Sequence, residues 1–374
     1  MHLGMLNKIW RSGMLYYIMN KDNKLASFEW KELADNNTIA VNLKQIDNIP
    51  DFILKDINDW IESRTPPKHR EHMICLLKAM NLSNSKSIID YSKGLSLTDT
   101  LWITNDTSIR WKDVSLYRNQ FDEVIANIAF DGGLRGIKFS TTSPEFATDG
   151  MLPKCWVRDK GTITLKKGGT SGFANTGNEP YSEVLASQLL DVLEYEHIKY
   201  TLETYRGKLV SSCDLMTNEE ISLIPLYKIV YVNNFNDIIE YAKSINSIKE
   251  LYQMIIFDYL SLNTDRHLGN IGVLVNSDTF KPIKLAPIYD NGASMLNYYM
   301  VGDSLEDFVA RNIPNLYNSF SILAIKAKEK AGNSNIEKAL NIKFNRKKVK
   351  GYSDDKIDII EKFVTNRVSE FLTW

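Results

Sequence analysis

Cysteine and histidine are scarce in this chain of 374 residues. The three cysteines, Cys75, Cys155 and Cys213, are too few and too scattered for a disulfide framework or a four-thiolate zinc site. The five histidines show no ligand spacing. These absences exclude a disulfide-rich secreted scaffold and a structural zinc module, and they predict a protein of the reducing cytoplasm.

Long apolar segments and an excess of one charge are also missing. The apolar run at residues 13–19 is too short to cross a membrane, which takes about 20 residues, so we expect a strand there and no membrane span. Lys and Arg number 45 against 46 Asp and Glu, for a net charge of -1. A balanced charge does not favour direct binding of nucleic acid.

The pattern of apolar residues predicts an α+β protein in three stretches. Residues 1–117 form an accessory domain of strands followed by helices, and Ser96 to Asp99 resembles a capping box that starts one of those helices. Residues 118–233 alternate strands with one helix, which predicts an antiparallel sheet with a helix packed on it. Residues 234–374 are mostly helical. The helices expected with the clearest apolar periodicity span residues 50–61, 68–80, 179–194, 248–262 and 354–371.

The most informative segment is residues 263–270, which read Asn-Thr-Asp-Arg-His-Leu-Gly-Asn. Asp265 is followed five residues later by Asn270, and an apolar hairpin separates both from Asp290. Phosphoryl transfer uses these parts in this order, because one Asp accepts the hydrogen bond of the attacking hydroxyl while an Asn and a second Asp bind Mg²⁺. Taken singly, each residue is better explained as part of a turn or a cap. Together they predict a catalytic base, Asp265, and two metal ligands, Asn270 and Asp290.

A nucleotide also needs a cation on its phosphates. Lys166 and Lys167 lie on a predicted strand, where alternation sends their side chains to opposite faces, so that only one can enter the cleft. We choose Lys166, because Lys167 adjoins the glycine-rich loop at residues 168–172. Glu179 and Glu183 follow on one face of the next helix, and either can pair with the lysine.

Two segments are candidates for holding the phosphates through backbone N–H groups and hydroxyls. One is the glycine-rich loop at residues 168–172. The other is the Ser/Thr-rich loop at residues 140–150, which precedes the lysine strand and contains Ser143, Thr148 and Gly150. In a kinase the phosphate-binding loop precedes the strand that carries the lysine, so we prefer the loop at residues 140–150.

These residues resemble the HipA-like kinases. Those kinases carry an Asn-Thr-Asp-x-His-x-x-Asn loop, present here at residues 263–270, and a later Ala-Pro-x-Tyr-Asp turn, present at residues 286–290. A Gly-x-x-x-Lys strand entry matches residues 150–154, and an Asn-Glu helix start matches residues 178–179. The resemblance implies a two-lobed kinase-like fold, ATP and Mg²⁺ as cofactors, and Ser/Thr phosphorylation.

The resemblance also implies a role for single residues. Lys166 binds the phosphates and Glu179 orients it, while His267 fixes the loop or faces the γ-phosphate. Gly269 stands where many HipA-like loops have lysine, which is closer to a lipid-kinase loop. Ala147 stands where those enzymes carry a self-phosphorylated serine, so self-phosphorylation is expected instead at Ser143 or Thr148.

Three functions follow in order of preference. The first is a HipA-like serine/threonine protein kinase, toxin-like, acting on a protein substrate and regulated by an antitoxin-like partner on residues 1–117. The second is a lipid or small-molecule kinase on the same fold. The third is a catalytically silent nucleotide-binding module, against which the filled catalytic positions argue.

Overall fold

The computed structural model describes residues 14–67, 71–132, 143–148, 152–171, 176–312, 320–331 and 335–374. The chain divides into two compact units. The first comprises residues 1–128 and 132–150, and the second comprises residues 129–131 and 151–374. The division into domains at residues 117 and 233 stays a prediction.

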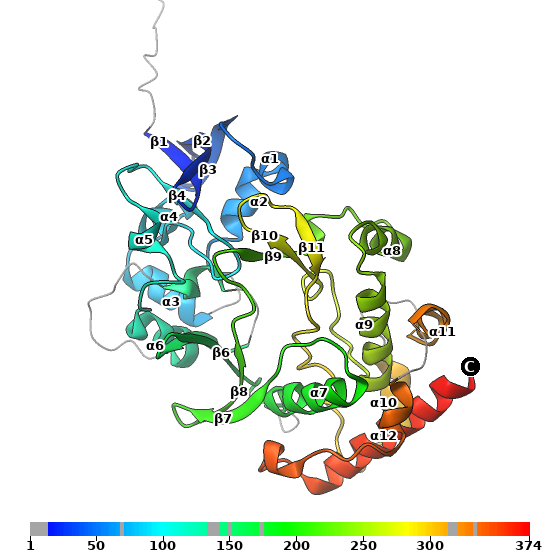
Figure 1. The fold of residues 1–374 in the computed structure, drawn as a ribbon. Coiled ribbons are helices and arrows are strands. Elements are labelled where there is room, and N and C mark those ends of the chain that lie inside the picture. Colours follow the sequence, from blue (N-terminus) through cyan, green and yellow to red (C-terminus); the bar gives the residue numbers. More distant parts are fainter. Residues whose placement is uncertain are drawn as a thin grey trace, which may run out of the picture. The chain divides into compact units, whose positions relative to one another are not determined.

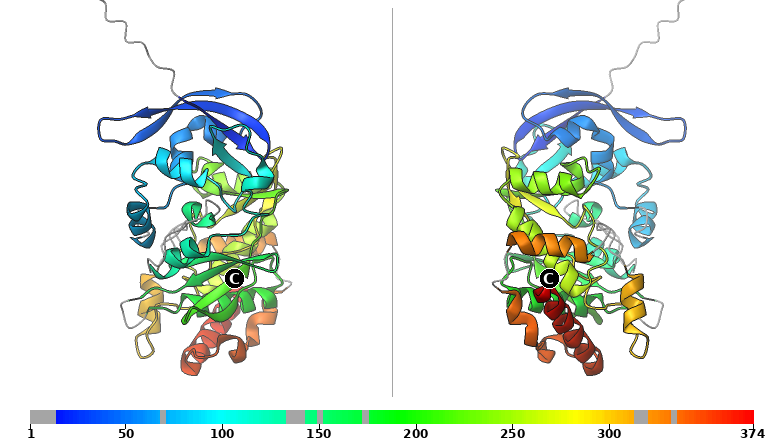
Figure 2. Two further views of the ribbon diagram at one scale, coloured as in Figure 1. Left: turned by 90° about the vertical axis from the view of Figure 1, so that its left-hand side faces the viewer. Right: turned by 90° about the vertical axis from the view of Figure 1, so that its right-hand side faces the viewer.

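The first unit is built on a four-stranded antiparallel sheet in the order β3-β2-β1-β4. Its strands are β1 (Leu15–Asn20), β2 (Asn23–Glu32), β3 (Thr38–Gln45) and β4 (Leu101–Thr104). The strand expected near residues 13–19 is therefore confirmed as β1. Phe28 and Trp102 are fully buried in the core of this unit. Figures 1 and 2 show α1 and α2 against one face of the sheet.

Short helices complete the first unit. They are α1 (Asp51–Lys55), α2 (Ile57–Glu62), α3 (Glu71–Ala79), α4 (Ser85–Ser92), α5 (Trp111–Val114), the first part of α6 (Glu123–Asp131) and the 3-10 helix η1 (Pro144–Ala147). The helix expected over residues 50–61 is split, because Asp56 adopts extended backbone and caps α2 by accepting from the N–H groups of Asn58 and Asp59. The helix start expected at Ser96 is wrong. Its hydroxyl accepts from the N–H of Thr98 in a turn that leads into β4.

The second unit opens with a four-stranded antiparallel sheet in the order β5-β6-β8-β7. Its strands are β5 (Lys154–Asp159), β6 (Thr162–Gly168), β7 (Thr201–Tyr205) and β8 (Lys208–Asp214). Helix α7 (Glu179–Leu193) packs on this sheet through a row of fully buried side chains that includes Leu185 and Leu189. The antiparallel sheet with one packed helix that the sequence predicts is thereby confirmed.

A smaller antiparallel sheet in the order β11-β10-β9 lies in the same unit. Its strands are β9 (Ile221–Pro225), β10 (Gly272–Asn276) and β11 (Pro282–Leu285). The remaining elements are α8 (Phe235–Ser244), α9 (Ile248–Ser261), α10 (Leu305–Arg311), α11 (Phe320–Ala331), α12 (Asp354–Thr373) and the 3-10 helices η2 (Leu226–Lys228), η3 (Ile336–Asn341) and η4 (Arg346–Val349). No helix in the described part of the chain is long and apolar enough to span a membrane.

Helix α9 is the rigid base from which the predicted catalytic loop starts. From Leu251 to Ser261 nearly all its residues are buried, as expected for a helix that is apolar around most of its circumference. Helices α8, α11 and α12 pack around it. The loop between α9 and β10 and the turn after β11 therefore emerge from buried elements.

Candidate active site

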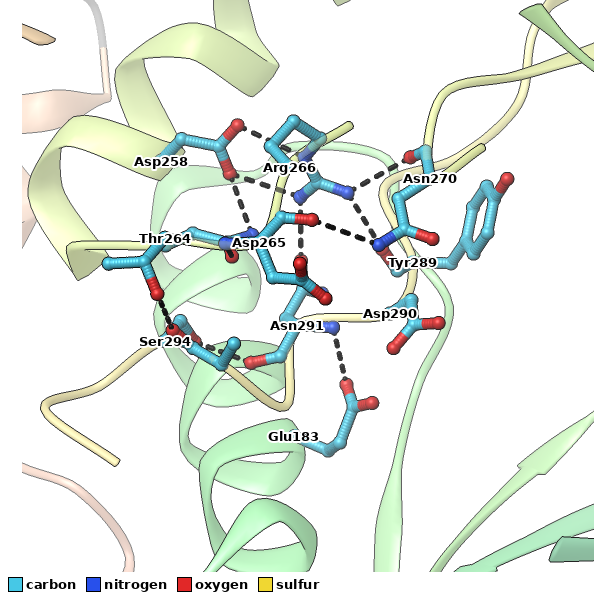
Figure 3. A network of polar contacts seen from close by, with 12 residues as sticks. Glu183, Asp258, Thr264, Asp265, Arg266, Asn270, Tyr289, Asp290, Asn291 and Ser294 are labelled. Carbon is cyan, nitrogen blue, oxygen red and sulfur yellow. Dashed lines mark hydrogen bonds and ion pairs between the residues drawn. The ribbon is translucent and has the colours of Figure 1, made fainter. Parts of the chain in front are cut away.

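The predicted base, Asp265, lies on the loop that follows α9. The helix ends where Leu262 turns into left-handed backbone (φ 51°). Asn263 then donates to the Asp258 carboxylate over 3.0 Å, and its own Oδ1 accepts from the N–H of Asp265 over 3.3 Å. The carbonyl of Asp265 accepts from the side-chain amide of Asn270 over 3.1 Å. The loop is closed on itself, which brings together the base and the first metal ligand predicted from their spacing (Figure 3).

The second predicted metal ligand, Asp290, lies on the turn after β11. The hydroxyl of Tyr289 donates to the carbonyl of Gly269 over 3.0 Å and so ties this turn to the loop. Asp290 has left-handed backbone (φ 55°), which Asp tolerates better than most residues, and its N–H donates to the hydroxyl of Tyr200 over 3.3 Å. Asp290 and Asn270 are thus held on neighbouring backbone segments (Figure 3).

Arg266, which the sequence analysis left without a role, joins these segments. Its guanidinium pairs with the carboxylate of Asp258 on α9. It also donates to the carbonyls of Asn270 and Tyr289 and to the side-chain oxygen of Asn291. The side chain of Arg266 is 0% exposed. A buried arginine therefore links the helix, the loop and the turn.

The lysine that faces this site is Lys167, not Lys166, and the sequence-based choice is corrected. Lys167 pairs with Glu183 over 2.5 Å and with Asp290 over 2.7 Å. Lys166 points to the opposite face and pairs with Glu203 on β7. The two lysines do alternate as expected, but α7 packs on the face of the sheet that carries Lys167, and this packing decides which lysine enters the site.

Glu179 does not pair with the lysine either. Its carboxylate accepts from the N–H of Thr170 over 3.1 Å, from the Thr170 hydroxyl over 2.7 Å and from the Tyr298 hydroxyl over 3.3 Å. A Cβ at Gly169 would lie 2.8 Å from the Glu179 carboxylate, so glycine is required for this close approach. Glu179 thus holds the glycine-rich loop after β6, and Glu183, one turn further along α7, takes the lysine.

Comparisons with known proteins bear on this arrangement. No protein-family model matches the chain. The chain is similar to the serine/threonine-protein kinase CtkA of Helicobacter pylori, with 28% identity over 155 residues that cover 37% of this chain and 47% of that protein. The match therefore spans about half the length of this curated relative. The crystal structure of CtkA superposes with a TM-score of 0.44 and 18% identity over 60% of this chain and 89% of that one.

A second solved structure is similar over almost the whole chain. It is the HipA of Shewanella oneidensis, in complex with HipB and its operator DNA, with a TM-score of 0.51 and 10% identity over 96% of this chain and 98% of that one. The chain has the fold of the HipA-like kinases. The predicted α+β, kinase-like fold is confirmed.

Opposite charges dominate the centre of the candidate site. Burial alone would lower the pKa of Lys167, but the carboxylates of Asp290 and Glu183 outweigh it and raise that pKa. Burial would likewise raise the pKa of Asp290, yet Lys167 and then Lys154 hold it well below its usual range. Burial raises the pKa of Glu183, and Lys167 opposes that shift. Lys167 is therefore charged, and Asp290 is ionised, over the whole physiological pH range.

Two residues of the candidate site are absent from the site residues predicted from the sequence. Lys154 is buried on β5 opposite Lys167, and its charge acts on Asp290. The sequence did offer a signal for Lys154, because it is the last residue of the Gly-x-x-x-Lys match at residues 150–154. Tyr200 is buried beneath the lysine, whose Nζ lies 5.9 Å from the centre of its ring. Tyr200 carries no local signal, because its hydroxyl accepts from the N–H of Asp290, 90 residues further along the chain.

The residues predicted for the 140–150 loop lie in the first compact unit. Ser143 caps η1 by accepting from the N–H of Glu145, and the hydroxyl of Thr148 donates to the carbonyl of Pro144. Both side chains are buried. Their self-phosphorylation stays a prediction, and it requires this segment to open. Gly150 lies outside the described residues.

His267 fixes its own loop. Its Nδ1 accepts from the N–H of Gly269 over 3.0 Å. A Cβ at Gly269 would lie 2.8 Å from Cε1 of the same ring. The contact with His267 is therefore a local steric reason for glycine at this position, where many HipA-like loops have lysine.

The donor set fits a magnesium ion better than a transition metal. The amide nitrogen of Asn270 is engaged with Asp265, which leaves its oxygen as the ligand atom. The Asp290 side chain is 40% exposed and offers a carboxylate. Hard oxygen ligands of this kind suit Mg²⁺, which keeps waters and shares phosphate oxygens. Within the described ranges, no group of three or more His, Cys, Asp or Glu side chains is placed to hold a metal ion alone.

Proposed function

We propose that this chain is an ATP- and Mg²⁺-dependent protein kinase that phosphorylates serine or threonine. The observation that carries the proposal is the convergence of Asp265, Asn270 and Asp290 beside the buried pair of Lys167 and Glu183. A base, two oxygen ligands and a phosphate-binding cation are the parts that phosphoryl transfer requires. The similarity to the serine/threonine-protein kinase CtkA supports the class of acceptor.

In this proposal each residue has one task. Asn270 and Asp290 hold Mg²⁺, which neutralises charge on the phosphates when it is bound. Lys167 leaves Asp290 in part to bind a phosphate oxygen, and Glu183 keeps it oriented. Asp265 accepts the proton of the acceptor hydroxyl as its oxygen attacks the γ-phosphorus and the bond to the bridging oxygen of ADP breaks.

The test is a transfer assay with labelled ATP and MgCl₂ on the full chain, offered protein, peptide and phosphoinositide acceptors and followed by mass spectrometry. Phosphate on Ser or Thr that is lost in Asp265→Asn supports the proposal. Label on lipid alone would favour the lipid-kinase alternative, for which the glycine at 269 is the specific observation. Nucleotide binding without any transfer would favour a silent module.

We propose further that the first compact unit binds a protein regulator. The HipA neighbour was solved with HipB and operator DNA, which supports a partner of this kind. This proposal includes a cytoplasmic, toxin-like kinase, whose activity a bound regulator would restrain. Co-purification of a protein partner with the full chain from its own cells, lost when residues 14–128 are replaced, tests this part.

A further inference from the structure

Arg266 uses all of its hydrogen-bonding capacity inside the protein. A guanidinium has five N–H donors, and five hydrogen bonds are present. Nε and Nη2 donate to the two oxygens of Asp258, each over 3.0 Å, and Nη2 also donates to Oδ1 of Asn291 over 2.8 Å. Nη1 donates to two backbone carbonyls over 3.0 and 2.9 Å. Since the side chain is fully buried, water replaces none of these bonds.

The two carbonyls on Nη1 belong to the metal site. One is the carbonyl of Asn270 itself, and the other is that of Tyr289, directly before Asp290. A single nitrogen therefore bridges the backbones of the two predicted metal-ligand segments, in addition to the hydrogen bond from the Tyr289 hydroxyl to the carbonyl of Gly269. The bidentate pair with Asp258 anchors that nitrogen to α9, which is buried along most of its length. Figure 3 shows the guanidinium lying between α9, the catalytic loop and the turn at Asp290.

We propose that Arg266 is a positioning residue that sets the affinity of the site for its metal ion. The proposal rests on the proposed function, because Asn270 and Asp290 are taken as the ligands. Because its side chain is fully buried and its N–H donors are bonded within the protein, Arg266 acts through the segments that carry the ligands. Partners that orient metal ligands are worth about 10- to 100-fold in metal affinity. Lysine cannot replace Arg266, since its ammonium has three donors and no planar fork to bridge both carbonyls and Asp258.

The test compares two conservative variants of buried Arg–Asp pairs. Arg266→Lys changes the pair at the metal site. Arg64→Lys is the matched control, because Arg64 is only 4% exposed, pairs bidentately with Asp99 over 3.0 and 2.5 Å, and belongs to the first compact unit. For each full-length variant, Mn²⁺ affinity is measured by electron paramagnetic resonance with a non-hydrolysable ATP analogue, alongside thermal denaturation and the Mg²⁺ dependence of transfer.

We expect Arg266→Lys to weaken Mn²⁺ binding about 10- to 100-fold and to recover part of its activity at high Mg²⁺. Arg64→Lys should lower the melting temperature but bind Mn²⁺ as the wild type does. Wild-type Mn²⁺ affinity in folded Arg266→Lys, or an equal loss in Arg64→Lys, would overturn the proposal. If Arg266→Lys does not fold, Asp258→Asn decides, since Asp258 anchors the guanidinium of Arg266 through two of its five hydrogen bonds, and unchanged Mn²⁺ affinity in this variant would equally overturn the proposal. Failure of the wild type to bind Mn²⁺ with nucleotide would instead refute the proposed function.

Discussion

Replacing Lys167 by methionine should disable the nucleotide site, whereas the same change at Lys166 should not. Methionine keeps most of the length and removes the charge. Lys167 is buried between Glu183, whose side chain is 1% exposed, and Asp290, whose side chain is 40% exposed. Lys166 pairs with Glu203, whose side chain is 39% exposed. The side chain of Lys166 is itself 12% exposed, so the two neighbours compare a buried ion pair inside the site with a partly buried ion pair outside it.

The size of each effect follows from burial. Removing one partner of a buried pair leaves an uncompensated charge on Glu183, which costs about 3–5 kcal/mol in the free energy of unfolding. The Lys166–Glu203 pair is partly exposed, so we expect Lys166→Met to cost less, about 1 kcal/mol, which is the upper end for exposed pairs. A hydrogen bond to a charged phosphate is worth about 1.5–3 kcal/mol, so Lys167→Met should bind ATP about 10- to 100-fold more weakly.

Two assays on the same samples test this comparison. Urea unfolding followed by circular dichroism gives the free energy of unfolding, and calorimetric titration with ATP and MgCl₂ gives the affinity. Titration is done at a temperature where both variants are folded. Weaker nucleotide binding in Lys166→Met with an unchanged Lys167→Met would refute the assignment of the lysine and the register of β6 with it.

Three further predictions concern the base, the glutamates and pH. Asp265→Asn should lower the rate of phosphoryl transfer by at least about 100-fold while Mn²⁺ affinity and melting temperature change little, and full turnover would refute the base. Glu183→Gln should raise the KM for ATP more than Glu179→Gln does, because of these two glutamates Glu183 is the one that contacts Lys167. A larger rise in KM for Glu179→Gln in steady-state kinetics would show instead that Glu179 orients Lys167. Burial lowers the pKa of Lys356 to about 8. Between pH 8 and 10.5, the usual pKa of lysine, the folded chain therefore binds fewer protons than the unfolded chain. The free energy of unfolding of the wild type should then rise with pH relative to that of Lys356→Met. A difference between the two that stays constant with pH in urea unfolding would contradict this.

The sequence by itself determined the order and spacing of the catalytic parts. Local rules were enough to predict the roles of Asp265, Asn270 and Asp290, because a loop after a helix and a turn after a short hairpin place these residues close together in the sequence. The hydrogen bond from Asn270 to the carbonyl of Asp265 agrees with that placement. Helices α7, α9 and α12 were likewise predicted near their observed bounds, since apolar periodicity over ten or more residues is a strong signal.

Only the tertiary structure decided which lysine and which glutamate of two candidates lie at the site. Alternation along β6 is a local property, but the face that becomes buried depends on where α7 packs, so Lys167 and Lys166 could not be told apart. Glu179 and Glu183 share one helix face. Their positions along α7 differ by one turn, and only the position of Glu183 brings its carboxylate to Lys167, whereas Glu179 contacts Thr170.

Arg266 marks the limit most clearly. In the sequence it is a charged residue at an unspecified position of a motif, and charged residues are mostly exposed. Burial became favourable only because every N–H donor finds an acceptor. Asp258, eight residues earlier on α9, accepts two of the hydrogen bonds, and two backbone carbonyls and the side-chain oxygen of Asn291 accept the other three. Such satisfaction is a property of three segments meeting in space, so no local pattern contains it.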